Sequence, residues 1–300
     1  MTGIDATSLG DFLAEQVQMV DRVLNVWVPD ETVDPSSIHR AMRYSLFAGG
    51  KRIRPILAIA AARAVNSSAE GIEHAAASLE LVHTYSLVHD DLPALDNDDL
   101  RRGRPTCHKV FGDAMAILAG DALLTLSFEV LSRLGDVSAE RKIWLVEELS
   151  RAAGTVGGMI GGQVNDIEGE RKPPTALLLD SIHRAKTGAL LRASVRMGAI
   201  YAGASEQELL ALSLYGEHIG LAFQIIDDVL DVEESSEALG KTAGKDEAQQ
   251  KITFPAVYGL DRSRQMAEQE RLAAHHVLRG FGSRAERLRQ IADFIVQRKA

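Results

Sequence analysis

The sequence predicts an all-α fold, built as a single large helical bundle of 300 residues. Strand signals are scarce, because no Asn-Gly or Asp-Gly hairpin turn occurs and only 5% of the residues are aromatic. Helical signals are frequent. Long segments rich in alanine and leucine run at about 71–90, 112–134, 138–160, 173–202 and 206–232. Several of them are apolar on nearly all sides, which is typical of the central helices of a bundle.

Capping signals mark helix boundaries outside these segments. Asp34-Pro35 predicts an N-cap with proline at the first helical position. Ser283 and Glu286 form a capping box ahead of an apolar stripe near the C-terminus. No fixed-period repeat, low-complexity tract or linker divides the chain, so we expect one domain over residues 1–300.

The composition is that of an ordinary globular protein, with 46% hydrophobic and 25% charged residues. No apolar run approaches the roughly 20 residues that span a bilayer, and residues 1–20 lack the basic start and unbroken apolar stretch of a signal peptide. Cys107 is the only cysteine, which excludes an internal disulfide and is typical of a reducing compartment. We therefore expect a cytoplasmic protein that is not inserted in a membrane.

The net charge of −9 argues against a nucleic-acid-binding protein, which usually carries an excess of Lys and Arg. Basic residues nevertheless gather in two groups: Lys51, Arg52 and Arg54, and Arg101, Arg102 and Arg104. The second group directly follows the densest acidic run, from Asp90 to Asp99. An acidic chain that concentrates cations beside carboxylates is suited to handling a metal-bound anion.

Two clusters of aspartates follow apolar helical segments: Asp90, Asp91 and Asp96, and Asp227, Asp228 and Asp231. Asp227 and Asp231 are four residues apart and share one helical face, and Gln224 lies one turn earlier. Like charges at this spacing destabilise an isolated helix, and burying them among apolar residues costs more. A bound cation removes both penalties.

The ligands in these clusters are all oxygens, which favours Mg²⁺ over Zn²⁺, with Mn²⁺ as the alternative metal. Mg²⁺ commonly bridges one or two carboxylates to the phosphates of a substrate. One such cluster could equally be a solvated acidic helix end. Two clusters of the same form indicate a site for a magnesium-bound phosphate.

The order, spacing and flanking residues of the clusters resemble the trans-prenyltransferase family of isoprenyl diphosphate synthases, and most of all its bacterial farnesyl diphosphate synthases. Residues 90–96 match the first aspartate-rich motif of the family and residues 227–231 the second. The resemblance runs from about Gly49 to Pro255. It implies an isoprenoid-synthase bundle with a central active-site cavity. The metal ligands that it implies are Asp90, Asp91, Asp96, Asp227 and Asp231.

The segment GGKRIRP, at 49–55, lies between a predicted helix stop and the next helix. Glycines let backbone N–H groups approach an anion, and Lys51 and Arg54 can contact phosphate oxygens. In isolation, an ordinary basic loop is the simpler interpretation. The resemblance implies that the diphosphate of isopentenyl diphosphate is bound by Gly50, Lys51, Arg54, His83 and Arg102.

The resemblance also implies residues at the allylic diphosphate: Arg101, Lys186, Lys241 and Lys251. It places Thr187 close to the reacting carbons, where dipoles of this residue and of Gln224 stabilise a carbocation. Gln163 and Asp166 take supporting roles. The polar segment 233–252, which contains two of these lysines, is either a surface loop or a lid that closes over the ligand.

The implied activity is Mg²⁺-dependent head-to-tail condensation of isopentenyl diphosphate with dimethylallyl or geranyl diphosphate, by a homodimer. Tyr85 and Ser86 lie five and four residues before Asp90, roughly 6–8 Å along the helix. A tyrosine there either closes the chain pocket, which favours 15-carbon farnesyl diphosphate, or is an ordinary core residue. Geranylgeranyl or geranyl diphosphate is the alternative product. A terpene cyclase would lack the second motif and GGKRIRP, and a non-catalytic synthase subunit would lack an aspartate motif.

Overall fold

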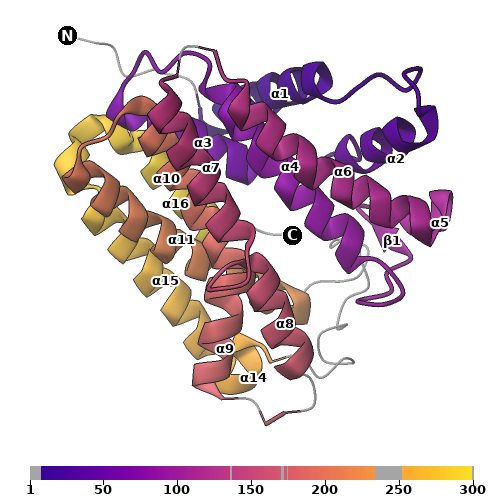
Figure 1. The fold of residues 1–300 in the computed structure, drawn as a ribbon. Coiled ribbons are helices and arrows are strands. Elements are labelled where there is room, and N and C mark those ends of the chain that lie inside the picture. The colour runs from indigo at the N-terminus through magenta and orange to yellow at the C-terminus, as the bar shows by residue number, and fades with distance from the viewer. Residues whose placement is uncertain (1–7, 136, 170–171, 174, 234–251, 299–300) are drawn as a thin grey trace.

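The structure is a computed structural model that describes residues 8–135, 137–169, 172–173, 175–233 and 252–298 (Figure 1). Its helices are α1 (Leu9–Trp27), α2 (Ser36–Leu46), α3 (Ile53–Val65), α4 (Ile72–Asp90), α5 (Cys107–Phe111), α6 (Asp113–Ser132), α7 (Ala139–Ala153), α8 (Met159–Gly169), α9 (Ala176–His183), α10 (Ala189–Ala202), α11 (Glu206–Glu233), α14 (Phe254–Tyr258), α15 (Leu260–Val277) and α16 (Glu286–Gln297). The strands of the described residues are the antiparallel pair β1 (Leu100–Arg101) and β2 (Arg104–Pro105). The all-α prediction is confirmed.

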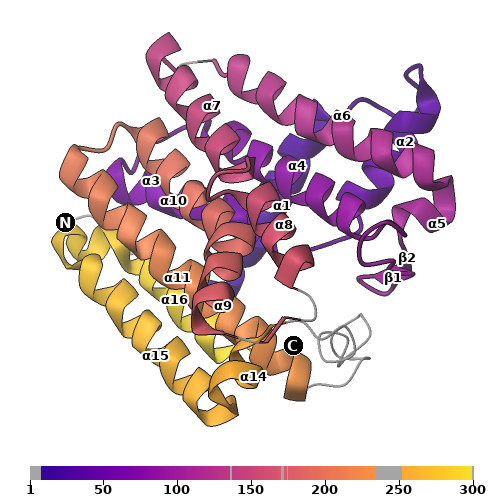
Figure 2. The same ribbon diagram turned by 60° about the horizontal axis from the view of Figure 1, so that its bottom comes forward.

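Helices α3, α4, α10 and α11 form the centre of the bundle. Helix α10 packs against α3, α4, α7 and α11, while α6 covers α4 and α15 covers α11 (Figures 1 and 2). Ten of the thirteen residues of α3 and twelve of the nineteen residues of α4 are buried. Helices that contact neighbours on most sides need apolar residues on most sides, which explains the weak periodicity of these segments.

Several details of the predicted helices were wrong. Helix α2 begins at Ser36 with Pro35 as its N-cap, one residue later than predicted. The segment 138–160 is interrupted, because α7 ends at Ala153 and a turn of five residues precedes α8. The segment 173–202 contains a π-helix, Arg184–Gly188, between α9 and α10. Ser283 is not an N-cap, since it lies within a 3₁₀ helix that runs directly into α16.

The prediction that no segment could span a bilayer was also wrong on length and composition. Helices α6 and α11 are long and apolar enough to cross a membrane. Their most apolar windows are 39% and 50% buried inside the bundle. The buried part lies where α6 packs against α4 and where α11 packs against α15 and α10.

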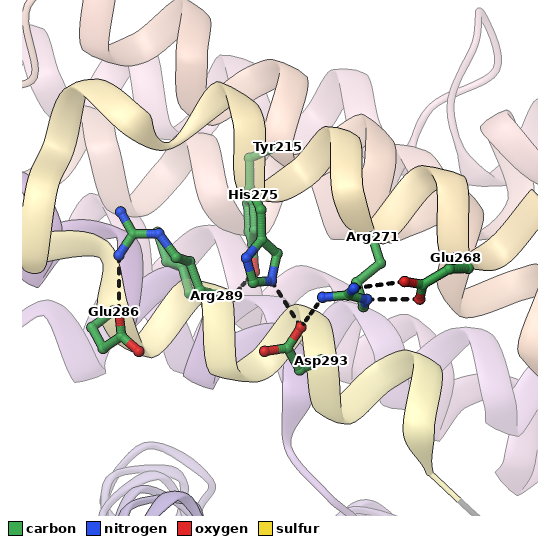
Figure 3. A network of polar contacts seen from close by, with 8 residues as sticks. Tyr215, Glu268, Arg271, His275, Glu286, Arg289 and Asp293 are labelled. Carbon is green, nitrogen blue, oxygen red and sulfur yellow. Dashed lines mark hydrogen bonds and ion pairs between the residues drawn. The ribbon is translucent and has the colours of Figure 1, made fainter.

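A polar seam joins α15 and α16 (Figure 3). The Asp293 carboxylate on α16 accepts a hydrogen bond from Arg271 at 2.6 Å and lies 2.8 Å from the imidazole of His275, both on α15. The buried Tyr215 hydroxyl of α11 donates to the Leu288 carbonyl of α16 at 2.6 Å. These contacts fix α16 against the central helices, so that the chain leaves α16 beside the cavity described next.

Candidate active site

A cavity of about 700 Å³ lies between α3, α4, the β1–β2 hairpin, α8, the π-helix and α11. It brings together residues far apart in the sequence. The predicted site residues that line it are Lys51, Arg54, His83, Tyr85, Ser86, Asp90, Arg101, Arg102, Gln163, Lys186, Thr187 and Asp227. Lys241, Lys251 and the proposed lid at 234–251 lie outside the described residues.

The lining combines positive charge with hydrocarbon. Six cationic side chains line the cavity against two carboxylates, Asp90 and Asp227, although the whole chain carries a net charge of −9. The large apolar side chains of the lining are Leu87, Leu95, Met159, Ile160, Val164, Phe223 and Leu230. Such a cavity suits a ligand with an anionic head and an apolar tail.

The first aspartate motif begins at the last residue of α4, and the following loop folds back on it. The Asp96 N–H donates to the Asp90 carbonyl at 2.8 Å, and the Asp98 N–H donates to the Asp91 carbonyl at 3.1 Å. The carboxylates thus gather at the negative end of a helix dipole, which disfavours their charge. Cations are needed to hold them ionised there.

Burial raises the pKa of Asp90 to about 6, and the charges of Asp96 and Asp91 act in the same direction, while Lys186 opposes them. The pKa of Asp91 is also raised by burial, against the effect of Arg101. The Arg101 guanidinium donates from Nε to both carboxylate oxygens of Asp91, at 2.8 and 3.0 Å. Arg101 therefore organises the motif as well as facing the cavity.

The raised pKa of Asp90 predicts a pH-dependent penalty on folding in metal-free protein. The proton is bound more tightly in the folded state, so the contribution of Asp90 to stability is lost as pH rises from about 4 through 6. Asp90→Asn should stabilise the protein by up to about 2 kcal/mol at pH 7 and by little at pH 4. Thermal melting in EDTA at both pH values checks this; equal effects at the two values would contradict it.

The second motif presents its three aspartates differently. Asp227 is exposed and lines the cavity, where the C-terminal Arg298 pairs with it. Asp228 and Asp231 are 3% and 5% exposed and do not line the cavity. Spacing predicts that Asp227 and Asp231 share one helical face toward the ligand; in the structure Asp227 lines the cavity, whereas Asp231 is buried away from it.

The described residues contain no group of three His, Cys, Asp or Glu side chains close enough to form a metal cluster. The donors still fit Mg²⁺, because Asp90 and Asp227 both offer carboxylate oxygens to one cavity, and the six cations there suit the phosphates that would share the metal. A site with few protein ligands is typical of Mg²⁺ that is shared with substrate phosphates. Asp90 and Asp227 would hold the metal from the cavity wall, with Asp96 from the adjoining loop. Asp91 and Asp231, which are 3% and 5% exposed and do not line the cavity, would reach it only after their side chains turned outward.

The GGKRIRP loop is fixed by Arg52, for which the sequence analysis predicted no separate role. Arg52 is 3% exposed, has a left-handed φ of 48°, and pairs with Glu80 at 2.7 Å and Asp21 at 2.9 Å. The guanidinium of Arg102 donates to the Gly49 carbonyl and covers Gly50. A Cβ on residue 50 would lie 2.8 Å from that guanidinium, and its φ is +136°, so glycine is required there.

The remaining cations of this region lack full compensation: Arg54 is half-buried and Lys51 is exposed beside the cavity. Burial lowers the pKa of Arg54 to about 10 and lowers the pKa of Lys51. The Nε of Arg54 is buried and has no hydrogen-bond partner among the described residues. Burial and the nearby arginines lower the pKa of His83, which keeps it neutral. Cations held in this way favour a bound anion.

The π-helix turns Lys186 and Thr187 into the cavity. The Lys186 ammonium pairs with Asp166 of α8 at 2.6 Å, which gives Asp166 its supporting role. The backbone of α8 lies close to that of the π-helix, since a Cβ on Gly162 would lie 2.1 Å from the backbone nitrogen of Lys186. Thr187 donates to the Gln224 side-chain carbonyl at 2.8 Å.

Tyr85 and Ser86 lie on the wall of the cavity, as predicted. Tyr85 is 5% exposed, and burial raises the pKa of its hydroxyl to about 12. Its ring packs edge-on against His89, which in turn approaches the Ile117 carbonyl of α6 at 3.0 Å. Met159 of α8 is another buried residue of the lining.

Sequence reasoning missed several lining residues. Arg298 packs over the Phe223 ring at 4.1 Å and pairs with Asp227, yet a single arginine near the chain end carries no motif. Met159 and Val164 had a recoverable signal, because they flank Gln163, which had been singled out.

Comparisons with known proteins cover nearly the whole chain. The Polyprenyl synthetase family model matches residues 35–293. The chain is 48% identical over 277 residues to geranylgeranyl pyrophosphate synthase 12, chloroplastic, of Arabidopsis thaliana, covering 91% of this chain and 76% of that protein. It is 45% identical over 270 residues to the farnesyl diphosphate synthase of Geobacillus stearothermophilus, covering 89% of each.

Solved structures give the same result. An FPP/GFPP synthase from Zymomonas mobilis superposes with a TM-score of 0.85 at 36% identity, covering 96% of this chain and 98% of that one. The geranylgeranyl pyrophosphate synthetase of Pyrococcus horikoshii Ot3 superposes with a TM-score of 0.88 at 31% identity, covering 97% and 98%. The bundle is thus shared with proteins whose names give different product lengths.

Proposed function

The chain belongs to the polyprenyl synthetase family and is a trans-prenyl diphosphate synthase, and we propose that its main product is the 15-carbon farnesyl diphosphate. The resemblance seen in the aspartate motifs is thereby confirmed. The substrates are isopentenyl diphosphate and an allylic diphosphate, dimethylallyl or geranyl. The observation that carries the 15-carbon proposal is the buried ring of Tyr85 on the cavity wall, five residues before Asp90.

Geranylgeranyl diphosphate, with 20 carbons, is the second candidate product. Several relatives at 45–49% identity are named geranylgeranyl pyrophosphate synthases. They are at least as similar to this chain as the farnesyl diphosphate synthase of Geobacillus stearothermophilus is. Overall similarity therefore does not separate the two products, and the argument for 15 carbons rests on Tyr85.

In the proposed reaction, the bond between C1 and oxygen of the allylic substrate breaks and its electron pair leaves with the diphosphate. The π electrons of isopentenyl diphosphate attack C1 of the allylic substrate. Loss of a proton from C2 of the isopentenyl unit then restores a double bond. Lys186 and Arg101 hold the leaving diphosphate, while Lys51, Arg54 and Arg102 hold the other one. Bound Mg²⁺ would supply charge neutralisation for the leaving group.

The chain's own groups favour this chemistry in two further ways. The apolar lining keeps water from the carbocation, and the Thr187 oxygen lies where it can face the positive charge. Two histidines line the cavity, but burial and the nearby arginines lower the pKa of His83, and a ring nitrogen of His89 faces the Ile117 carbonyl at 3.0 Å, so neither is an obvious base for the proton at C2 of isopentenyl diphosphate. The released diphosphate is the acceptor in this proposal.

The product is tested by incubating purified protein with labelled isopentenyl diphosphate and each allylic primer, followed by sizing of the dephosphorylated products. We expect mainly 15-carbon product, no activity in EDTA, and recovery with Mg²⁺. A main product of 20 carbons would establish the second candidate. Full activity in metal-free buffer would contradict the metal dependence.

The two diphosphate sites should separate by mutation. Arg54→Ala should raise the KM for isopentenyl diphosphate roughly tenfold or more and change the allylic KM little, because it removes a charge-assisted contact to one substrate. Lys186→Ala should instead affect the allylic KM and kcat. Steady-state kinetics with each substrate varied in turn checks both variants. An effect of both mutations on the same substrate would show that the sites are wrongly assigned.

We propose a homodimer that buries the outer face of α6. Ile117 and Leu118 are 45% and 54% exposed on this helix, and Ile143 and Trp144 of α7 are 66% and 47% exposed. Light scattering should give twice the chain mass of 32.5 kDa, and Leu118→Glu should shift it toward one chain mass. A monomeric wild type at micromolar concentration would contradict the proposal.

A further inference from the structure

Four groups form a continuous hydrogen-bonded chain that starts at the cavity wall. The Thr187 hydroxyl donates to Oε1 of Gln224 at 2.8 Å. Nε2 of Gln224 donates to Oδ1 of Asp228 at 2.7 Å. The other carboxylate oxygen of Asp228, Oδ2, accepts the backbone N–H of Phe254 at 2.9 Å. These hydrogen bonds join the π-helix, α11 and the start of α14, and α11 contacts both of the other elements.

The donor and acceptor of each of these hydrogen bonds follow from the buried end of the series, at the Phe254 N–H. The Phe254 N–H can only donate, so Oδ2 of Asp228 accepts there, and the Gln224 amide directs its nitrogen at Oδ1. The amide oxygen of Gln224 is thereby turned toward Thr187. Thr187 must then donate its proton to Gln224, so its oxygen lone pairs remain for the cavity that this residue lines.

Asp228 is also held apart from the proposed metal ligands. It is 3% exposed and does not line the cavity, whereas its sequence neighbour Asp227 is exposed and does. On its other side, the His183 ring nitrogen Nε2 lies 3.5 Å from Oδ2, and this ring stacks on Phe254. Both carboxylate oxygens thus have partners in the interior.

We propose that Asp228 is a positioning residue that sets the polarity of the Thr187 hydroxyl, rather than a metal ligand. The inference rests on the proposed reaction, because the negative end of that hydroxyl dipole then faces the allylic carbocation. Asp228 acts through Gln224 and does not touch the substrate. Preorganised dipoles of this kind stabilise a charged transition state without reorganisation.

The test is Asp228→Asn, which keeps the shape of the side chain and reverses the direction of the hydrogen bonds from residue 228 to Thr187. The asparagine oxygen must still accept the Phe254 N–H, so its amide nitrogen faces Gln224. The Gln224 amide then turns round, and Thr187 must direct its proton into the cavity. We expect kcat to fall about 100-fold, with both KM values within about threefold. The Mg²⁺ concentration for half-maximal activity and the melting temperature should stay near those of wild type.

Adding Gln224→Glu to Asp228→Asn should restore the wild-type direction of the hydrogen bond from Thr187. A glutamate at 224 accepts from the asparagine amide and from Thr187, and the total charge equals that of wild type. We expect kcat to recover about tenfold or more over the single variant. An unchanged kcat in Asp228→Asn, a large rise in its Mg²⁺ requirement, or no recovery in the folded double variant would each overturn the inference.

Gln224→Met keeps the test decisive if Asp228→Asn does not fold, because it breaks the chain without altering Asp228. It should lower kcat with little change in either KM, and a wild-type kcat would overturn the inference. The wild-type assay separates the two claims. A wild type without prenyl transfer would refute the proposed function, whereas an active wild type with fully active variants would refute only the role of Asp228.

Discussion

Replacing Asp90 with asparagine should lower kcat by about three orders of magnitude or more while the bundle stays folded. Asp90 is the carboxylate of the first motif that lines the cavity, and it lies among Lys186 and Arg101. Asparagine has nearly the same shape but lacks the charge that would hold Mg²⁺ near the leaving diphosphate in the proposed reaction. Loss of about 4 kcal/mol of transition-state stabilisation corresponds to this decrease.

Asp99→Asn is the matched control for this substitution. Asp99 belongs to the same acidic loop but pairs with Lys109 at 2.7 Å and is not part of the cavity lining. Its kcat should stay within about twofold of wild type, as is usual for an exposed ion pair. Steady-state kinetics and the helical circular dichroism spectrum are measured for both variants. Turnover near that of wild type in Asp90→Asn would remove the metal argument.

The parts of the site that local spacing determines could be predicted from the sequence. Asp90 follows an apolar helix, the 49–55 loop joins two helices, and Lys186 precedes a glycine; all three lie at one cavity. These features are local because a helix end or a glycine fixes the backbone over a few residues. The family resemblance then supplied the pairing of the segments.

The parts that depend on tertiary packing could not be predicted in this way. Spacing places Asp227 and Asp231 on one helical face, yet only contact with other helices decides that Asp231 is buried. Arg298 reaches the cavity because α16 packs against α11, and no sequence pattern near Arg298 predicts that packing. The break after Ala153 was missed for the same reason, since α7 and α8 together read as one apolar segment.

Truncating Tyr85 to alanine should lengthen the product by one or more five-carbon units. The ring is 5% exposed, lies on the cavity wall and stands five residues before Asp90 on α4. Its removal leaves space lined by hydrocarbon, which can accept more of an isoprenoid tail. The aspartates and cations are untouched, so the metal-dependent step should survive. Alanine favours helix, although the lost packing costs about 3–5 kcal/mol.

Tyr85→Phe separates the ring from its hydroxyl and should leave the product length of wild type, because the ring still fills the same space. Mass-spectrometric sizing of dephosphorylated products from wild type and both variants decides the matter. The expected shift is upward from the wild-type length, whether that is 15 or 20 carbons. If an active, folded Tyr85→Ala enzyme kept the wild-type product, the floor of the pocket would lie elsewhere. Met159, which is buried on α8 and lines the same cavity, would then be the next residue to truncate.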